Sequence, residues 1–213
     1  MSINRIFRQA LYVVLDIDLP YLRKDPLSLA EDLLRGGVDI LQLRSKFSPG
    51  KYLFALGKKI KKIVRKNKAI FIINDRVDIA KIVEADGVHL GQEDLPVDFA
   101  RNMLGKDKII GLSTHNLAQA RRAQRSEIDY ISVGPVFKSP TKPELKPIGI
   151  EGLKKIVKIS RLPVVAIGGI NPDNLPEVLG CGVDSVAVIS SILKSKDIVE
   201  RVKVFKQLLS YGY

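Results

Sequence analysis

The stretch "AIFIIND", residues 69–75, is the clearest indication of the fold. It is almost continuously apolar, and polar residues appear only where it ends. A strand with one face in water would alternate apolar and polar residues, so this pattern indicates a strand covered on both faces, as in a parallel sheet. Seven further runs have the same character: 11–17, 39–44, 86–90, 109–113, 130–137, 163–169 and 185–190.

Amphipathic segments long enough for helices lie between these runs, for example 27–35, 53–66, 117–125, 152–160 and 198–209. A regular alternation of strand and helix predicts right-handed βαβ units. Eight such units can close into a barrel that has no edge strand, and no Pro-, Gly- or Ser-rich linker divides the chain. We therefore predict an α/β protein with a single (β/α)8 TIM barrel domain over residues 1–213.

An open, doubly wound sheet is the alternative fold. It would typically have five or six strands and a glycine-rich turn after the first strand. Here the first strand ends in "LDIDLP" (15–20), which contains no glycine. The barrel is therefore the better interpretation.

Composition narrows the class of protein and its partners. The net charge of +12 favours polyanions or phosphorylated metabolites. The basic segment 57–68 has its apolar residues at helical spacing and no aromatic residue among its charges, which favours a solvated helix face over a nucleic-acid site. The single cysteine, the lack of a signal peptide and the lack of an apolar run of ~20 residues predict a cytoplasmic protein without a membrane or nucleic-acid partner. A homo-oligomer remains open.

Polar residues gather where the predicted strands end, which is where TIM barrels carry their chemistry. After the second strand, Gln42, Arg44 and Lys46 are spaced by two, so they share one face of the strand, and that pattern points to an anion. After the third and fourth strands come Asn74, Asp75, His89 and Asp94. Asp75 and Asp94 could cap the following helices, or they could hold Mg²⁺ together with substrate phosphate oxygens.

The last strands indicate a second anion site. "AIGGIN" (166–171) and "AVISSI" (187–192) end in small residues, and TIM barrels often bind phosphate on these two loops. Gly168 and Gly169 would let the backbone approach a ligand, and Ser190 and Ser191 could add hydroxyls; glycine could also simply relieve a tight turn. Ser113 could donate to a phosphate, whereas His115 and Asn116 fit a turn and a helix cap. Two phosphorylated ligands side by side suggest a transferase.

Seven motifs resemble those of the thiamine phosphate synthase family and occur in family order from Tyr12 to Ile192. They are "LQLRSK", "IINDRVDIA", "ADGVHLGQEDLP", "GLSTHN", "VGPVFKSPTKP", "AIGGINPDNL" and "AVISSI". Members of that family join a hydroxymethylpyrimidine diphosphate to a thiazole phosphate and release pyrophosphate with the help of Mg²⁺. The resemblance implies the same small-molecule substrates and the same cofactor for this chain.

The resemblance also implies a role for individual residues. The diphosphate would be bound by Arg44, Lys46, Asn74 and Lys142, with help from Ser113; of these, Arg44, Lys46, Lys142 and Ser113 would act in catalysis. Asp75 and Asp94 would hold Mg²⁺. The pyrimidine would contact Gln42 and His89. The thiazole phosphate would be held by Ser139, Thr141, Gly168, Gly169, Ile189 and Ser190. Lys138 and Lys146, in the same loop as Lys142, are expected to be solvated.

Two departures from the family pattern stand out, because Ser139 and Leu15 occupy positions where many members carry threonine. Two alternatives to the synthase also remain. A thiazole tautomerase relative shares the fold and the thiazole phosphate pocket, but it usually lacks the full diphosphate and Mg²⁺ set. A non-catalytic barrel that binds a phosphorylated ligand would need no catalytic lysine.

Overall fold

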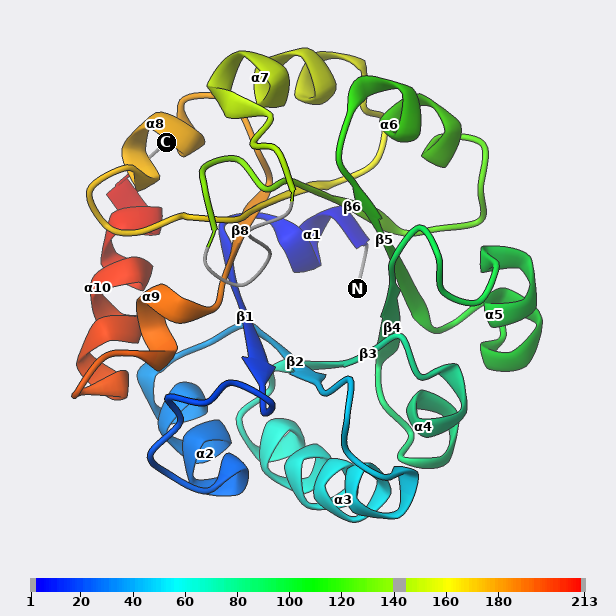
Figure 1. The fold of residues 1–213 in the computed structure, drawn as a ribbon, viewed down its shortest axis with the longest axis vertical. Coiled ribbons are helices and arrows are strands. Elements are labelled where there is room, and N and C mark those ends of the chain that lie inside the picture. The colour runs from blue at the N-terminus through cyan, green and yellow to red at the C-terminus, as the bar shows by residue number, and fades with distance from the viewer. Residues whose placement is uncertain (1–2, 140–144, 212–213) are drawn as a thin grey trace.

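Eight parallel strands form a closed barrel, in which each strand pairs with the next along the chain and β8 pairs again with β1 (Figure 1). The structure is a computed structural model that describes residues 3–139 and 145–211. The strands are β1 (Ala10–Asp16), β2 (Ile40–Arg44), β3 (Ile70–Asn74), β4 (Gly87–Leu90), β5 (Ile109–Thr114), β6 (Tyr130–Val133), β7 (Val164–Ile167) and β8 (Ser185–Val188). The predicted (β/α)8 barrel is confirmed, and the open sheet is excluded because no strand edge is left unpaired.

Helices surround the barrel and cover the outer face of its strands (Figure 1). The helices after β1 are α2 (Pro26–Gly36), α3 (Gly50–Lys66), α4 (Val77–Ile82), α5 (Val97–Leu104), α6 (Leu117–Ala123), α7 (Gly149–Ile159), α8 (Leu175–Leu179), α9 (Ser190–Leu193) and α10 (Ile198–Tyr211), and α1 (Ile3–Phe7) precedes the first strand. The helices predicted from periodicity are all present. In the described residues, no helix is long and apolar enough to cross a membrane.

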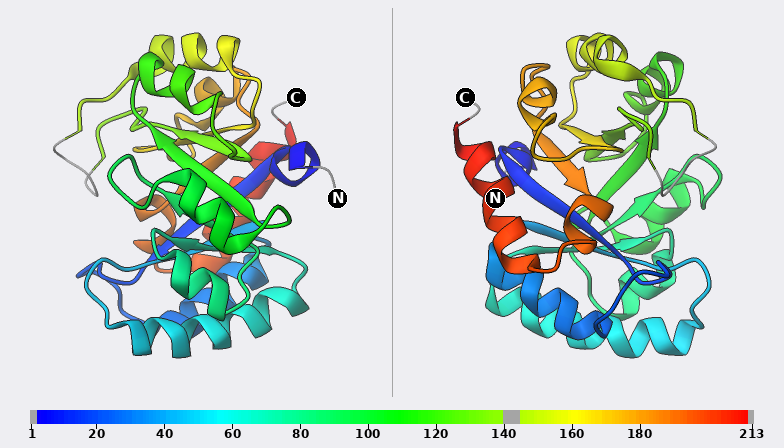
Figure 2. Two further views of the ribbon diagram at one scale, coloured as in Figure 1. Left: turned by 90° about the vertical axis from the view of Figure 1, so that its right-hand side faces the viewer. Right: turned by 60° about the vertical axis from the view of Figure 1, so that its left-hand side comes forward.

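Helix α1 was not predicted, and it lies across one end of the barrel, opposite the β2–α3 and β6–α7 loops (Figure 2). Its Phe7 is fully buried and its ring centroid lies 4.4 Å from that of Tyr130 inside the barrel. Ile3 and Ile6 also pack against this inner cluster, so α1 does present apolar residues at helical spacing, but five residues are too short a stretch for that spacing to stand out in the sequence. Helix α1 therefore closes the end of the barrel at which the strands begin.

The hydrophobic core has two layers, one inside the barrel and one between the strands and the helices. Side chains of Tyr12, Val14 and Ile72 belong to the inner layer. Leu15, the departure from the family pattern in β1, is fully buried in the outer layer. Because residues alternate along a strand, the side chain at position 15 packs against the helices and not toward the barrel interior.

The run 130–137 was expected to be one strand, but β6 ends at Val133. Pro135 has no N–H with which to extend the ladder. A Cβ at Gly134 would also lie 2.0 Å from the carbonyl oxygen of Ile167. The chain therefore leaves the sheet early, and the β6–α7 loop begins close to β7.

The basic helix α3 behaves largely as predicted. Its residues Leu53, Leu56, Ile60 and Val64 are buried, while most of its basic side chains are exposed. Lys61 is the exception: its ammonium lies 2.7 Å from the carboxylate of Asp86 at the start of β4. This contact is part of a repeated arrangement.

Four aspartates, here called the aspartate ring, occupy equivalent positions just before β2, β4, β6 and β8. They are Asp39, Asp86, Asp129 and Asp184. Each accepts a hydrogen bond of 2.7–2.8 Å from a backbone N–H near the start of the preceding strand, donated by Leu11, Phe71, Ile110 and Val164 respectively. The ring thus joins the strands in pairs at the end of the barrel that α1 closes.

A basic side chain from the helix that lies between two strand pairs contacts each of the first three members of the ring. Lys206 of α10 contacts Asp39 at 2.6 Å, Lys61 of α3 contacts Asp86, and Arg101 of α5 contacts Asp129 at 2.8 Å. Among residues 3–139 and 145–211, no basic side chain forms an ion pair with Asp184. These three ion pairs lie at the junctions β8–β1, β2–β3 and β4–β5, where one strand pair meets the next. The fourth junction, between β6 and β7, has no such ion pair in the described residues.

Candidate active site

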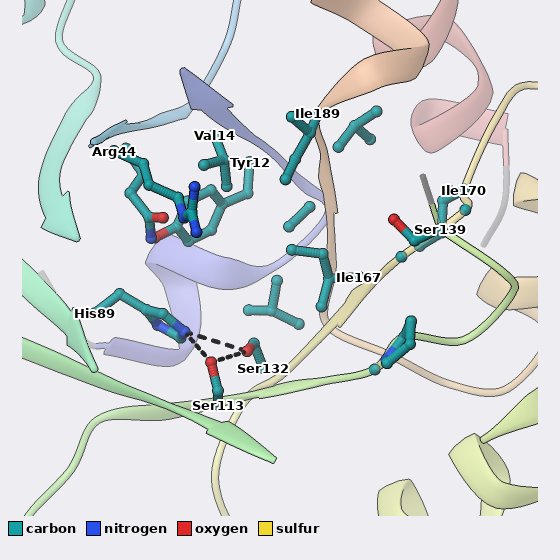
Figure 3. Close-up of a pocket in the computed structure, with 18 of the residues that line it drawn as sticks. Tyr12, Val14, Arg44, His89, Ser113, Ser132, Ser139, Ile167, Ile170 and Ile189 are labelled. Carbon is teal, nitrogen blue, oxygen red and sulfur yellow. Dashed lines mark hydrogen bonds between the residues drawn. The ribbon is translucent and has the colours of Figure 1, made fainter. Parts of the chain in front are cut away.

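A cavity of about 110 Å³ opens at the carboxyl ends of the strands (Figure 3). Most of the site residues predicted from sequence line it: Gln42, Arg44, Asn74, His89, Ser113, Ser139, Gly168, Gly169, Ile189 and Ser190. Lys46, Asp75 and Asp94 do not line it but form a cluster next to Asn74. Thr141 and Lys142 lie outside the described residues. The cavity therefore brings residues from both predicted anion sites together.

A chain of hydrogen bonds runs across the floor of the cavity. The Gln42 amide nitrogen lies 2.6 Å from the Tyr12 hydroxyl, which lies 2.9 Å from the Tyr130 hydroxyl. The Tyr130 hydroxyl is 2.8 Å from Nδ1 of His89, whose Nε2 is 2.9 Å from the Ser113 hydroxyl (Figure 3). All but Ser113 are buried, so this chain fixes the floor in one arrangement.

The Gln42 amide sets the direction of these hydrogen bonds. Its NH₂ group donates to the Tyr12 hydroxyl, and both tyrosine hydroxyl protons are satisfied when Tyr12 donates to Tyr130 and Tyr130 donates to Nδ1 of His89. With Nδ1 as an acceptor, a neutral His89 ring would carry its proton on Nε2, which lies 2.9 Å from the Ser113 hydroxyl and 3.3 Å from the Ser132 hydroxyl. The Ser113 hydroxyl keeps its own proton, so it can act as a donor toward a ligand.

Burial strengthens this assignment, because it keeps both tyrosines neutral. Burial raises the pKa of Tyr12 and of Tyr130 well above the usual value for a phenol. Each hydroxyl can therefore both donate and accept. The floor is a neutral hydrogen-bonding surface, suited to a polar ring with no net charge.

Arg44 and Lys46, predicted to share one face of β2, separate at the end of the strand. The Arg44 side chain lies above Val14 and Tyr12 in the cavity, and its guanidinium forms an ion pair with the buried carboxylate of Asp16 (Figure 3). Lys46 follows the strand and forms an ion pair with Asp75; its ammonium also lies 3.9 Å from Asp94. The alternation of strand positions therefore predicted Arg44 correctly, but it does not extend to Lys46.

The two carboxylates do not cap helices, so that alternative is wrong. Helix α4 has Arg76 at its N-cap and α5 has Pro96, and neither helix has a side-chain cap hydrogen bond. Asp94 accepts a hydrogen bond of 2.7 Å from the N–H of Gly91. Asp75 has a left-handed backbone with φ of 60°, which costs free energy and is often found at functional sites. Both carboxylates are therefore available for a ligand or metal.

The electrostatics of this cluster show two carboxylates competing for one cation. Burial, followed by the hydrogen bond and charge of Asp94, raises the pKa of Asp75 to about 6, although Lys46 opposes this. Burial alone would also raise the pKa of Asp94, but hydrogen bonds with Asp75 and with the Gly91 N–H, together with the Lys46 charge, hold it below its usual value. A second cation would relieve this repulsion.

Asn74 contributes a donor that has no partner among the described residues. Its side chain is buried, it lines the cavity, and its Nδ2 makes no hydrogen bond in the described residues. Leaving a buried N–H group unpaired costs free energy. Such a group is well suited to bind an acceptor atom of a ligand that enters the cavity.

The opposite wall is formed by the β7–α8 and β8–α9 loops. Gly168 and Gly169 have left-handed backbones, with φ of 101° and 69°. A Cβ at Gly168 would lie 2.5 Å from the Cα of Pro135, and one at Gly169 would lie 2.7 Å from the Lys138 carbonyl oxygen. Glycine is therefore required by both conformation and packing. Ser190 lines the cavity, whereas Ser191 does not.

Several cavity residues were not predicted as part of the site. They are Tyr12, Tyr130, Ser132 and His115, together with apolar residues such as Val14 and Ile167. The first strand did contain a signal, because Tyr12 and Val14 alternate on its inward face.

His115 was expected only to shape a turn; its Nδ1 lies 2.6 Å from the Gly134 carbonyl oxygen, and its ring also lines the cavity. Asn116 caps α6, as predicted. Lys138 and Lys146 are exposed, also as predicted.

Comparisons with known proteins agree with this arrangement. A family profile described as "Thiamine monophosphate synthase" matches residues 11–192. A protein of Persephonella marina named "Thiamine-phosphate synthase" is 44% identical over 94% of this chain and 95% of its own length. One of the same name from Moorella thermoacetica is 42% identical over 94% of this chain and 95% of its own.

A solved structure extends the likeness to three dimensions. The thiamine phosphate pyrophosphorylase of Pyrococcus furiosus superposes with a TM-score of 0.89 at 36% identity, covering 98% of both chains. The matched profile spans most of the chain, including the strands and loops that form the cavity. The chain therefore belongs to the thiamine monophosphate synthase family.

Proposed function

We propose that this chain is an Mg²⁺-dependent thiamine phosphate synthase, a transferase with two phosphorylated substrates. It would join 4-amino-2-methyl-5-hydroxymethylpyrimidine diphosphate to 4-methyl-5-(2-phosphooxyethyl)thiazole and release pyrophosphate. The observation that carries the proposal is the single cavity between two different anion-binding walls. One wall carries Arg44 and Asn74, and the other carries the glycine pair Gly168–Gly169 with Ser190.

In this reaction the bond between the pyrimidine methylene carbon and the diphosphate oxygen breaks, and the oxygen keeps the electron pair. The thiazole nitrogen donates its lone pair to the same carbon, which forms the new C–N bond and leaves the positive charge on the thiazolium ring. No proton is transferred in this exchange. The protein therefore needs no general base, and its tasks are to align the two substrates, stabilise the departing pyrophosphate and exclude water.

The wall at β2 and β3 would bind the diphosphate. Arg44 offers the guanidinium N–H groups that Asp16 does not occupy, and Asn74 offers its unpartnered Nδ2. The Ser113 hydroxyl, whose oxygen lies 2.9 Å from Nε2 of His89, would add a third donor. Lys46 and Lys142 would complete the set, as the family resemblance implies.

The described charges next to this wall explain why a metal ion would be needed. Arg44 and Lys46 carry two positive charges, whereas Asp16, Asp18, Asp75 and Asp94 carry four negative ones, which leaves a net charge of 2 − 4 = −2 when all are ionised. A diphosphate would be repelled by such a cluster unless a further cation were present. The carboxylates themselves are hard oxygen ligands of the type that Mg²⁺ prefers.

The residues present therefore fit Mg²⁺, with Asp75 and Asp94 as the side chains that would hold it. Among the described residues no group of three or more His, Cys, Asp or Glu side chains could hold a metal ion. Two carboxylates plus phosphate oxygens form a suitable set for Mg²⁺, which commonly keeps waters and substrate phosphates as ligands. When bound, Mg²⁺ would supply positive charge that stabilises the leaving pyrophosphate.

The remaining residues would orient the two rings. The neutral floor, from Gln42 to His89, suits the polar edge of an aminopyrimidine. The backbone of Gly168 and Gly169 can approach the thiazole phosphate because neither residue carries a Cβ, and Ser139, Thr141, Ile189 and Ser190 would complete that site. Binding the phosphate there would position the thiazole nitrogen toward the pyrimidine methylene.

An assay with the purified protein tests the proposal directly. The protein is incubated with both substrates and Mg²⁺, and thiamine phosphate and pyrophosphate are measured as products in equal amounts. Omission of either substrate or addition of EDTA should abolish both products, and excess Mg²⁺ should restore them. Folded protein that forms no thiamine phosphate would reject the synthase. Activity that is insensitive to EDTA would reject the metal requirement alone.

A further inference from the structure

Two carboxylates at the end of β1 contact the loop that carries Arg44 and Lys46, and neither was singled out from the sequence. We call Asp16 and Asp18 the acidic clamp. We propose that the acidic clamp is a positioning element that fixes Arg44 and Lys46 for binding of the diphosphate. This inference rests on the proposed function, because it assigns the clamp to that substrate's subsite.

Asp16 is placed by the register of the sheet. It stands opposite Arg44 in the β1–β2 pair, and the N–H of Ile17 donates to the Arg44 carbonyl oxygen at 2.9 Å. The Asp16 side chain is only 2% exposed and forms an ion pair with the Arg44 guanidinium. A buried carboxylate in this position fixes one edge of the guanidinium and leaves the other N–H groups for a ligand.

Asp18 holds the residues that follow Arg44. Its Oδ1 accepts a hydrogen bond of 2.6 Å from the Ser45 hydroxyl, and its Oδ2 accepts one from the backbone N–H of Lys46. Ser45 is buried and in turn accepts a hydrogen bond of 2.9 Å from the N–H of Ser48. The loop from Arg44 to Ser48 is therefore tied to the end of β1 by side-chain contacts as well as by strand pairing.

The two carboxylates are themselves coupled, because the N–H of Asp18 donates to Oδ1 of Asp16 at 3.2 Å. A structural role alone could be met by neutral acceptors at both positions. Two anions beside a site that must bind an anion are electrostatically unfavourable for binding. Two negative charges here should weaken diphosphate binding. Their presence is explained if holding Arg44 and Lys46 in the right orientation strengthens binding by more than this repulsion weakens it.

The two explanations predict opposite changes in pyrophosphate affinity, so they can be told apart by experiment. If the clamp acts only as nearby negative charge, Asp16→Asn should bind inorganic pyrophosphate more tightly. If it positions Arg44, the same change should weaken pyrophosphate binding, by about tenfold for the loss of one charge-assisted interaction. Calorimetric titration with pyrophosphate and Mg²⁺ measures this directly and does not depend on turnover.

A double-mutant cycle separates positioning from a general loss of structure. We expect Arg44→Ala to weaken pyrophosphate binding, and Asp16→Asn to have no further effect in the Arg44→Ala background, because the clamp would have lost the group through which it acts. In turnover assays Asp16→Asn should raise KM for the pyrimidine diphosphate while KM for the thiazole phosphate stays within about twofold. Asp86→Asn, which alters an aspartate with an ion pair at the other end of the barrel, is the matched control and should leave both KM values unchanged.

Several results would overturn the inference. They are unchanged or tighter pyrophosphate binding by folded Asp16→Asn, losses that add in the double variant, or equal increases in both KM values. If Asp16→Asn does not fold, the more exposed Asp18→Asn provides the same test through Ser45 and Lys46, with a several-fold weaker pyrophosphate affinity expected and an unchanged one contradicting the proposal.

The synthase proposal can fail separately from the clamp. Wild-type protein that binds pyrophosphate but makes no thiamine phosphate would reject the synthase, while the binding comparison would still decide the role of the clamp. Wild-type protein that makes thiamine phosphate but does not bind pyrophosphate would overturn the clamp and leave the synthase standing.

Discussion

The two ends of the barrel treat their polar groups differently. Where the strands begin, the aspartates of the aspartate ring accept hydrogen bonds from the protein itself. Where the strands finish, two carboxylates compete for one cation and a buried amide lacks a partner in the described residues. Each aspartate of the ring accepts a backbone hydrogen bond, and all but Asp184 have a basic partner among the described residues. At the other end, Asp75 and Asp94 share Lys46, and Nδ2 of Asn74 has no partner in the part of the chain that the structure describes. Both ends are charged, but at the end where the strands begin three of the four ring aspartates are neutralised by a basic side chain of their own.

The difference indicates how the fold divides its charged residues between stability and binding. An interaction completed inside the protein stabilises the folded state, while an incomplete one costs stability and leaves affinity for a ligand. Substitutions at the ring should therefore change the free energy of unfolding, and substitutions at the cavity should change turnover or affinity.

The largest effect is expected for Lys142→Ala. The family resemblance assigns this lysine to the diphosphate, so removing it should lower kcat by about 10²–10³-fold through lost charge stabilisation of the leaving group. The midpoint of thermal unfolding should not change. Lys146→Ala, an exposed lysine of the same loop, is the matched control and should retain full activity. Equal losses of stability and turnover in Lys142→Ala would contradict the assigned role.

At the aspartate ring we expect the reverse pattern. Asp129→Ala would leave the buried Arg101 guanidinium without its carboxylate and the Ile110 N–H without its acceptor, which should cost about 2–3 kcal/mol of unfolding free energy. Both KM values should stay unchanged. Asp184→Ala should cost less in chemical denaturation, because it removes the hydrogen bond from Val164 without breaking an ion pair in the described part of the chain. A greater loss at Asp184 would show that the ion pairs do not matter.

Gly168→Ala should affect both properties. The new Cβ would meet the Cα of Pro135 at 2.5 Å in a left-handed backbone, so we expect a loss of about 2 kcal/mol in stability and a raised KM for the thiazole phosphate. Gly180→Ala is the control, because its φ is −61° and its nearest neighbours would be 3.5 Å away. It should be neutral or slightly stabilising. A normal thiazole phosphate KM in Gly168→Ala would separate this loop from the phosphate site.

The smallest effect is expected for Asn74→Leu, a change of similar volume. Removing the unpartnered Nδ2 should raise the unfolding free energy by about 1 kcal/mol, while pyrophosphate affinity falls. The Ser185 hydroxyl is also buried, has no partner within residues 3–139 and 145–211, and lies at the other end of the barrel, so Ser185→Ala should stabilise the protein without changing affinity. If Asn74→Leu leaves pyrophosphate binding intact, its Nδ2 is not a ligand-binding group.

The barrel was predictable from sequence because each strand is apolar on both faces, as "AIFIIND" illustrates. The site was predictable to the extent that a residue's place at a strand end determines its surroundings, which holds for Gln42, Arg44 and Asn74. Asp16 was missed because its role depends on the register between β1 and β2, and the pattern of neither strand reveals that register. Tyr130 was missed because a tyrosine at the start of a strand is also typical of an ordinary core. The helix caps considered for Asp75 and Asp94 do not form, because capping depends on local backbone geometry that the residue type does not determine.

The junction between β6 and β7 has a dynamic consequence. Where the strands begin, this junction has no ion pair between strand pairs in the described residues. Where the strands finish, the N–H groups of Val136 and Phe137 donate to the carbonyl oxygens of Ile167 and Gly168. The start of the β6–α7 loop, which leads to Ser139, is thus tied to β7 by backbone hydrogen bonds and by packing of Val136 in the core, without an ion pair in the described residues. Local opening should need the least free energy at this junction. In hydrogen exchange, the amides at the start of β7 should therefore lose protection before those of the other strands.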